Sequence, residues 1–298
     1  MKHRSVLMGF VSVLIIGLTI ASVLIAGNQL IYTKARDANG ILFLKDVTST
    51  LTAGGFSLAR KAGITSYGLD INGTSPQVFR ILNSNDTLYI YIFKSIGERE
   101  KIIDIGSNDK PLAIFAPISR LSFFFPARNT LIVYVSESMP ILNSASDLRL
   151  KSLNNIVFTG LNDGKVLVFK GEGAYWKASV VYKYYEYWWQ DSGGRMQYES
   201  WHSAQPALTY KGADLKDIAP INYRYTFKAP SGSFGGSQDT GFDGSSVGAA
   251  GVSYGSGLAA AGLGSFSGNG ALTRADETYQ ATIDWNGERE SFSLKAES

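Results

Sequence analysis

The residues best suited to chemistry in this chain are aromatic, and they crowd into one stretch between residues 175 and 201. Aromatic side chains offer a rigid flat area with a polar edge, which suits stacking on sugar rings and packing against protein partners. The sequence therefore predicts a binding surface here. The aromatic residues of the stretch are Tyr175, Trp176, Tyr182, Tyr184, Tyr185, Tyr187, Trp188, Trp189, Tyr198 and Trp201.

Alternation along a strand divides these side chains between two faces. One face is expected to carry Tyr182, Tyr184 and Trp188, and the other Tyr185, Tyr187 and Trp189. A sandwich buries only one face of each sheet, so at least one aromatic row is expected outside the core. The candidate binding residues are Tyr175, Trp176, Tyr185, Tyr187, Trp188, Trp189 and Trp201. The alternative is a packed core with cross-strand aromatic pairs on its outer side, and Trp285 is expected in that core.

Groups for catalysis or metal binding are scarce. The chain has two histidines, His3 near the N-terminus and His202 on a predicted strand, where a lone histidine is expected to be packed or at the surface. There is no cysteine, which excludes disulfides, thiolate metal sites and a cysteine nucleophile. We therefore expect no cofactor, no metal site and no catalytic residue.

An envelope hydrolase remains an alternative on two weak signals. Ser246 and Ser253 each occupy the centre of a G-x-S-x-G match, but the tract is rich in Gly and Ser, and neither serine follows a strand and precedes a helix. Glu186 and Glu199 fall on facing predicted strands and could act as the paired carboxylates of a glycoside hydrolase.

The elements that must position the aromatic stretch are strands. Turn residues at 191–194 and at Asn286-Gly287 connect apolar, β-branched and aromatic runs, and helical patterns are nearly absent. We predict an antiparallel β-sandwich of immunoglobulin-like class over 165–298, with a flexible Gly/Ser-rich insert at 231–270. The predicted strands are 166–169, 175–189, 195–202, 207–210, 222–227, 278–285 and 290–294.

The first half mixes helical and strand patterns and predicts a small α+β domain at 40–160. A helix over 41–53 is expected to stop at Gly54-Gly55. Strand 87–93 is apolar on both faces and is therefore expected in the centre of its sheet. The remaining predicted elements are strands 77–82, 112–115, 121–125 and 130–135 and helices 95–105 and 146–154.

Residues 6–27 contain no charged side chain and follow Lys2 and Arg4. As a helix this run is long enough to cross a bilayer, and the preceding positive charge favours a cytoplasmic N-terminus. We predict a cytoplasmic leader at 1–5, a single transmembrane anchor at 6–27, a tether at 28–39 and an extracytoplasmic remainder. A cleaved signal peptide is one alternative.

A type IV pilin-like filament subunit is another alternative for the N-terminal run. A basic leader followed by Gly9, Phe10 and a long apolar segment resembles the start of such subunits, which are cut after the glycine. The glutamate usual at the fifth mature position is replaced here by Leu14. Glycines after residue 39 also interrupt a long continuing helix.

Charge limits the class of partner. The 298-residue chain carries a formal net charge of +3, and part of that charge sits in the leader. The exterior is therefore nearly neutral, which argues against nucleic acid as a partner. The predicted partners are the membrane and either a cell-wall glycan or an envelope protein.

Five blocks of sequence carry a family resemblance: 87–101, 129–135, 169–180, 208–212 and 281–295. They resemble a group of uncharacterised membrane-anchored or lipoprotein-like extracytoplasmic proteins of Gram-positive, bacillus-type bacteria. The resemblance implies a surface location and two small domains, and it transfers no catalytic residues. Many such proteins carry a lipid-modified cysteine, which this chain lacks, so anchoring is expected to depend on 6–27. The combined prediction is a non-catalytic cell-envelope surface protein that binds a glycan or a protein through its aromatic hairpin.

Overall fold

The computed structural model describes residues 40–61, 69–106, 122–136, 144–211, 223–238, 252–255, 258–262, 266–268 and 271–297. The chain divides into two compact units, Met1–Asn162 and Asp163–Ser298. The boundary between the units lies between residue 160, where the first domain was expected to end, and residue 165, where the second was expected to begin. The predicted leader, anchor and tether at 1–5, 6–27 and 28–39 lie outside the described residues. Within the ranges given above, none of the helices combines the length and apolar character needed to span a membrane.

The first unit is α+β, with one antiparallel sheet in the order β1-β2-β3-β5-β4. Its strands are β1 (Leu58–Arg60), β2 (Gln77–Ile81), β3 (Thr87–Ile92), β4 (Ser122–Ala127) and β5 (Thr130–Val135). β3 is central, as its two apolar faces predict. The strand expected at 112–115 lies outside the described residues.

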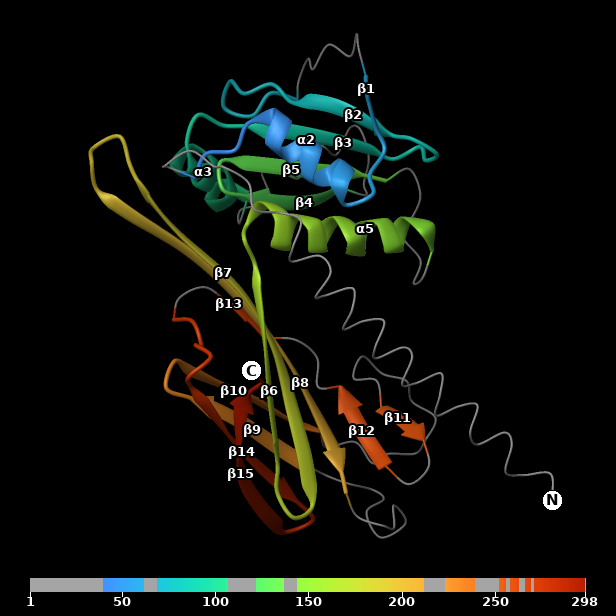
Figure 1. Ribbon diagram of the computed structural model, residues 1–298, viewed down its shortest axis with the longest axis vertical. Coiled ribbons are helices and arrows are strands. Elements are labelled where there is room, and N and C mark those ends of the chain that lie inside the picture. Colours follow the sequence, from blue (N-terminus) through green and yellow to red (C-terminus); the bar gives the residue numbers. More distant parts are fainter. Residues whose placement is uncertain are drawn as a thin grey trace, which may run out of the picture. The chain divides into compact units, whose positions relative to one another are not determined.

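Helices cover both faces of this sheet (Figure 1). One apolar core joins the sheet to α2 (Leu44–Ala53), α5 (Ala145–Ile156) and the π-helix Val157–Leu161. The opposite core includes Ile102 of α3 (Ile96–Gly106). α2 ends at Ala53 as predicted, because Gly54 caps it and Gly55 adopts a left-handed φ of +97°.

The buried carboxylate of Asp86 connects α5 to the sheet of the first unit. Asp86 is 3 % exposed, and its carboxylate accepts hydrogen bonds from Tyr134, Ser136 and Arg149, whose Nη2 lies 2.5 Å away. Burial alone would raise the pKa of this carboxyl. The hydrogen bonds from Tyr134, Ser84 and Arg149 outweigh that effect and hold the pKa below its ordinary value.

The second unit is almost entirely antiparallel sheet. Among the described residues, nine strands follow the order β10-β9-β14-β15-β6-β7-β8-β12-β11, and a tenth strand, β13, also pairs with β8. The strands are β6 (Lys165–Glu172), β7 (Trp176–Gln190), β8 (Met196–Tyr210), β9 (Tyr223–Ala229), β10 (Gly232–Gln238), β11 (Val252–Gly255), β12 (Leu258–Gly262), β13 (Phe266–Gly268), β14 (Thr278–Trp285) and β15 (Glu288–Ala296).

This sheet folds over on itself in a sandwich-like manner. β15 and β6 join its two parts through the pairs Lys295–Lys170 and Ala296–Phe169, and the Glu297 N–H donates to the carbonyl oxygen of Val168 at 2.8 Å. Side chains of β7 and β8 then share one core with side chains of β9 and β14, and the rings of Phe169 and Tyr279 meet edge to face at 4.9 Å. Gly171 allows this junction to form, because a Cβ there would lie 2.1 Å from the carbonyl oxygen of Ser293.

Two sequence predictions for the second unit need correction. β8 runs through Pro206 as one strand, where two strands were expected. The insert at 231–270 also contributes β10–β13 to the sheet, so a wholly flexible insert is wrong. Glycine fits β10 because a Cβ on Gly235 would lie 2.4 Å from the carbonyl oxygen of Tyr225 on the neighbouring strand.

Candidate binding site

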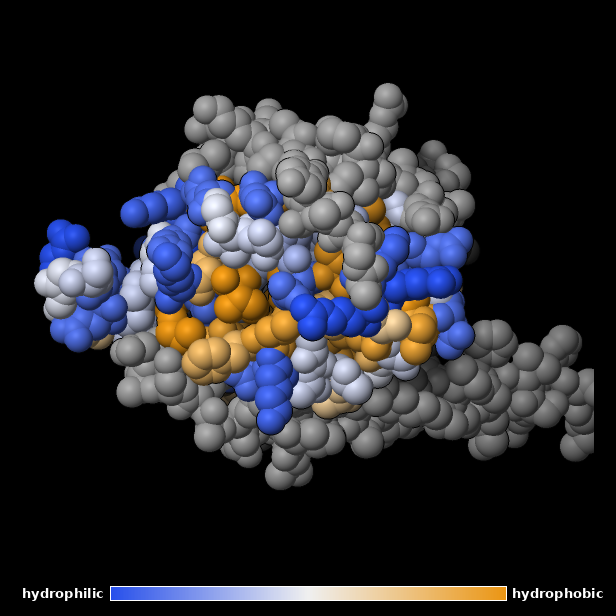
Figure 2. Space-filling view, turned by 90° about the horizontal axis from the view of Figure 1, so that it is seen from above, coloured by the Kyte–Doolittle hydropathy of each residue, from blue (hydrophilic) through white to orange (hydrophobic). Residues whose placement is uncertain are grey.

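The aromatic stretch forms a long two-stranded hairpin of β7 and β8, each 15 residues long (Figure 1). Pairing runs without a bulge from Trp176–Tyr210 to Gln190–Met196. The Asp191 carboxylate closes the turn by accepting hydrogen bonds from the backbone N–H groups of Gly193 and Arg195, both at 2.9 Å. The turn is hydrophilic, as the blue residues at the left of Figure 2 show.

One side of the hairpin, which we call the covered face, carries Tyr185, Tyr187, Trp189 and Trp201. Tyr185, Tyr187 and Trp189 are 9 %, 5 % and 6 % exposed, although they are not members of the sandwich core. The ring of Tyr185 stacks on that of Tyr187 at 5.8 Å and on that of half-buried Trp201 at 5.8 Å. Trp189 continues the row at 5.9 Å from Tyr187.

The opposite side, which we call the open face, carries Glu186, Trp188, Tyr198 and Arg274. Trp188 is 60 % exposed, and its ring centroid lies 4.3 Å from that of its cross-strand partner Tyr198. Tyr198 belongs to the aromatic stretch but is not among the sequence-predicted binding residues. The sequence contains a signal for it: Tyr198 follows the turn by as many residues as Trp188 precedes it, so the two are expected to pair across the hairpin.

An ion pair borders the two exposed rings. Arg274, from the segment before β14, donates to both oxygens of Glu186 at 2.5 and 2.9 Å. The Tyr198 hydroxyl donates to the same carboxylate at 3.3 Å. The hydrogen bonds from Arg274 hold the pKa of Glu186 below its ordinary value, and those same bonds raise the pKa of Arg274. Arg274 lies far from the hairpin in sequence, and no sequence signal points to it.

The other predicted binding residues lie apart from this pair. Tyr175 is 53 % exposed but sits at the far end of β7, where its ring lies 5.9 Å from that of Trp285. Trp176 is buried in the sandwich core together with Trp285, and their rings are 5.7 Å apart. The backbone N–H groups of Tyr175 and Trp176 both donate to the carboxylate of Glu290.

The two glutamates considered for glycoside hydrolysis do not lie together in one site. Glu186 pairs with Ser200 and Glu199 pairs with Tyr187, so the two glutamates project from opposite faces of the hairpin. Two carboxylates so placed cannot flank one glycosidic bond. Ser253 lies within β11 and not in a strand-to-helix turn, and Ser246 lies outside the described residues.

Two further observations concern metal binding and similarity to known proteins. In the part of the chain that the structure describes, no group of three His, Asp or Glu side chains could hold a metal ion. Comparisons of the chain with protein-family models, with curated proteins and with solved structures find no match in any of the three. Function therefore has to be inferred from the geometry of the hairpin.

Proposed function

We propose that this protein is a non-catalytic, extracytoplasmic protein of the cell envelope that binds an envelope glycan through the open face. The observation that carries the proposal is the exposed pair Trp188 and Tyr198, with the Glu186–Arg274 ion pair beside it. In this proposal the second unit is a sandwich of immunoglobulin-like class, and residues 6–27 form the membrane anchor.

The open face matches the chemistry of a sugar ring. A pyranose has an apolar C–H side that packs on an aromatic ring and hydroxyl groups at its edge that need donors and acceptors. Trp188 and Tyr198 supply exposed rings, while Glu186 and Arg274 supply charged groups for hydroxyls. The bidentate contact between those two side chains fixes their geometry before a ligand arrives, which lowers the entropy lost on binding.

The proposed location is supported by the N-terminal sequence. Residues 6–27 are apolar and uncharged, and Lys2 and Arg4 precede them. An anchor of this kind would hold the two units close to the membrane on the outer side, within reach of an envelope glycan.

Sedimentation with cell wall tests the proposal. The full chain, purified in mild detergent, is mixed with insoluble cell-wall glycan stripped of protein, and the bound fraction is measured. We expect the native chain to sediment with the glycan and Trp188→Ala/Tyr198→Ala to stay in solution. The matched control is Tyr175→Ala, which removes an exposed ring next to the other end of β7 and should bind normally. Equal binding by the double variant would exclude the open face.

A further inference from the structure

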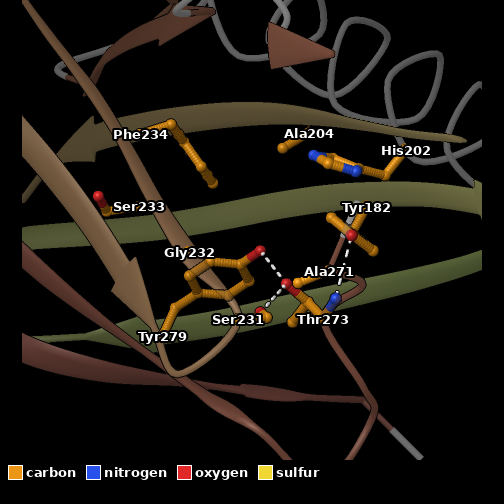
Figure 3. Close-up of a pocket in the computed structure, with 10 residues that line it drawn as sticks. All are labelled: Tyr182, His202, Ala204, Ser231, Gly232, Ser233, Phe234, Ala271, Thr273 and Tyr279. Carbon is orange, nitrogen blue, oxygen red and sulfur yellow. Dashed lines mark hydrogen bonds between the residues drawn. The ribbon is translucent and has the colours of Figure 1, made fainter. Parts of the chain in front are cut away.

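A pocket of about 310 Å³ lies inside the second unit, between the β7–β8 hairpin and the layer formed by β9, β10 and β14 (Figure 3). This volume is at the lower end of the range for small-molecule sites and suits a single ring. The pocket is lined by Tyr182, His202, Ala204, Ser231, Gly232, Ser233, Phe234, Ala271, Thr273 and Tyr279.

Aromatic rings form the walls of this pocket. Tyr182 and Tyr279 are buried, and the ring of Phe234 lies 5.6 Å from that of Tyr279. The imidazole of His202 stacks on Tyr182 at 5.6 Å with the planes 21° apart. None of the described residues that line the pocket is an acid, a lysine or an arginine. An uncharged ligand with a face for stacking is therefore the class that fits.

Hydroxyl groups hold one side of the pocket in place. Thr273 Oγ1 lies 2.8 Å from both the Tyr279 hydroxyl and Ser231 Oγ, and the Thr273 N–H donates to the Tyr182 hydroxyl at 3.0 Å (Figure 3). These bonds fix the orientation of both tyrosine rings. The pocket is therefore formed before any ligand enters, which favours binding.

His202 supplies an unused polar group. Its Nδ1 is buried and has no hydrogen-bond partner among the residues that the structure describes. Desolvation lowers the pKa of His202, so the imidazole is neutral at pH 7 and has one donor and one acceptor nitrogen. A buried polar atom without a partner is unusual in a folded protein, but Nδ1 is covered by protein atoms and is not open to the pocket. The other ring nitrogen, Nε2, is not among these buried atoms, and it is the one that a hydroxyl of a bound ring would meet.

The pocket and the open face belong to the same side of the hairpin. Tyr184 pairs with His202 and Trp188 pairs with Tyr198, and all four share one face by alternation. His202 follows Tyr198 by four positions on β8, a distance of roughly 13 Å along the strand. The Glu186–Arg274 ion pair lies between them in this register.

We propose that the pocket receives the terminal sugar ring of the glycan, whose following units pass Glu186 and Arg274 to reach Trp188 and Tyr198. This inference rests on the proposed function and adds the direction in which the glycan chain binds. Its terminal ring, which is uncharged and carries hydroxyl groups, occupies the pocket. The aromatic walls then discriminate by ring size and the neutral lining rejects a charged terminal unit.

The two histidines of the chain make a direct test simple, because ¹⁵N-histidine labelling gives signals from His3 and His202 alone. The full chain in detergent is titrated with N-acetylglucosamine and with its β-1,4-linked tetramer. We expect both probes to shift the imidazole ¹⁵N signals of His202 and to leave those of His3 in place. Binding of the tetramer without any shift at His202 would overturn the pocket proposal and leave the open face as the site.

Two variants separate the pocket from the open face. His202→Phe keeps a stacking ring but removes the polar atoms, and it should weaken the binding of both probes about tenfold. Trp188→Ala should weaken the binding of the tetramer and leave that of the single sugar unchanged. If His202→Phe bound the tetramer as well as the native chain did, the pocket would not be used. If neither probe bound to the native chain or to either variant, the proposed function itself would fail for this glycan.

Discussion

The two faces of the β7–β8 hairpin are built from the same kind of residue and have opposite surroundings. Trp188 is 60 % exposed and its chain neighbour Trp189 is 6 % exposed. On the covered face, rings stack on one another in a continuous row. On the open face, a ring pair stands beside a carboxylate and a guanidinium. Aromatic content alone therefore does not decide exposure, and the proposed binding surface is the face whose rings are exposed and have polar neighbours.

The largest expected effect comes from truncating the covered face. Trp189→Ala should lower the free energy of unfolding by about 4 kcal/mol, because it removes a buried aromatic side chain and leaves a cavity beside Tyr187. Urea denaturation followed by circular dichroism measures this. Trp189→Phe is the conservative control, and its free energy of unfolding should fall much less. An unchanged denaturation midpoint for Trp189→Ala would show that the two faces do not differ energetically.

The same contrast between buried and exposed groups exists for the two arginine–carboxylate pairs. Asp86→Ala should cost about 3 kcal/mol, because Arg149, Tyr134 and Ser136 lose their common acceptor. Glu186→Ala, at the less buried pair, should cost at most about 1 kcal/mol. Thermal unfolding of both variants against the native chain measures the difference, and equal losses would contradict it.

Asp86 also gives the first unit a defined response to acid. Its folded pKa is lowered, so its stabilising contribution is complete above the unfolded pKa of about 3.9 and is lost as the pH falls through the lower folded value. Native protein should therefore lose stability below about pH 4 more steeply than Asp86→Asn does. Denaturation at a series of pH values between 2 and 7 gives the two slopes for comparison.

A smaller effect is expected from the open face. Trp188→Ala should change the free energy of unfolding by less than about 0.5 kcal/mol, since the side chain is mostly in solvent. It should nevertheless weaken binding of the N-acetylglucosamine tetramer about tenfold, through the loss of one stacking ring. Calorimetric titration and urea denaturation of the same sample give both quantities. A large loss of stability with unchanged affinity would reverse the assignment of the two faces.

The smallest expected effect is the pH dependence of binding at Glu186. The hydrogen bonds from Arg274 lower its pKa below 4.5, so the carboxylate stays ionised at any pH above that value. Affinity for the tetramer should be constant from pH 8 to about 5 and fall severalfold only as the pH drops through the folded pKa. Glu186→Gln should bind somewhat more weakly and show no such fall. A decline that begins well above pH 5 would argue against titration of Glu186 as its cause.

Local patterns in the sequence predict much of this fold. Alternation correctly divides Tyr182, Tyr184 and Trp188 from Tyr185, Tyr187 and Trp189, and the apolar run at 87–93 correctly predicts a central strand. Those features depend on the period of a strand and on turn residues, which a short stretch of sequence contains.

Features that depend on distant residues could not be predicted. The sequence does not say which face of the hairpin is buried, because exposure depends on the rest of the fold. Glu186 and Arg274 are 88 residues apart, and no short pattern links them. The pocket around His202 likewise needs residues from β7, β8, β10 and β14. The glycines of β10 predict a flexible tract when only the sequence is considered, because the close approach of β9 that requires them is a contact of the folded unit.

The narrow junction between β15 and β6 has a consequence for how the second unit folds. Lys295 and Lys170 pair although most of the unit's sequence lies between them, whereas β6 pairs with β7 and β7 pairs with β8, the next strand along the chain in each case. Contacts between distant segments close slowly, because a long loop must first be ordered. The hairpin can therefore form early, before the pairing of β15 with β6 closes the sheet. Until β9 and β14 pack against it, the hairpin exposes the aromatic side chains that the folded core buries.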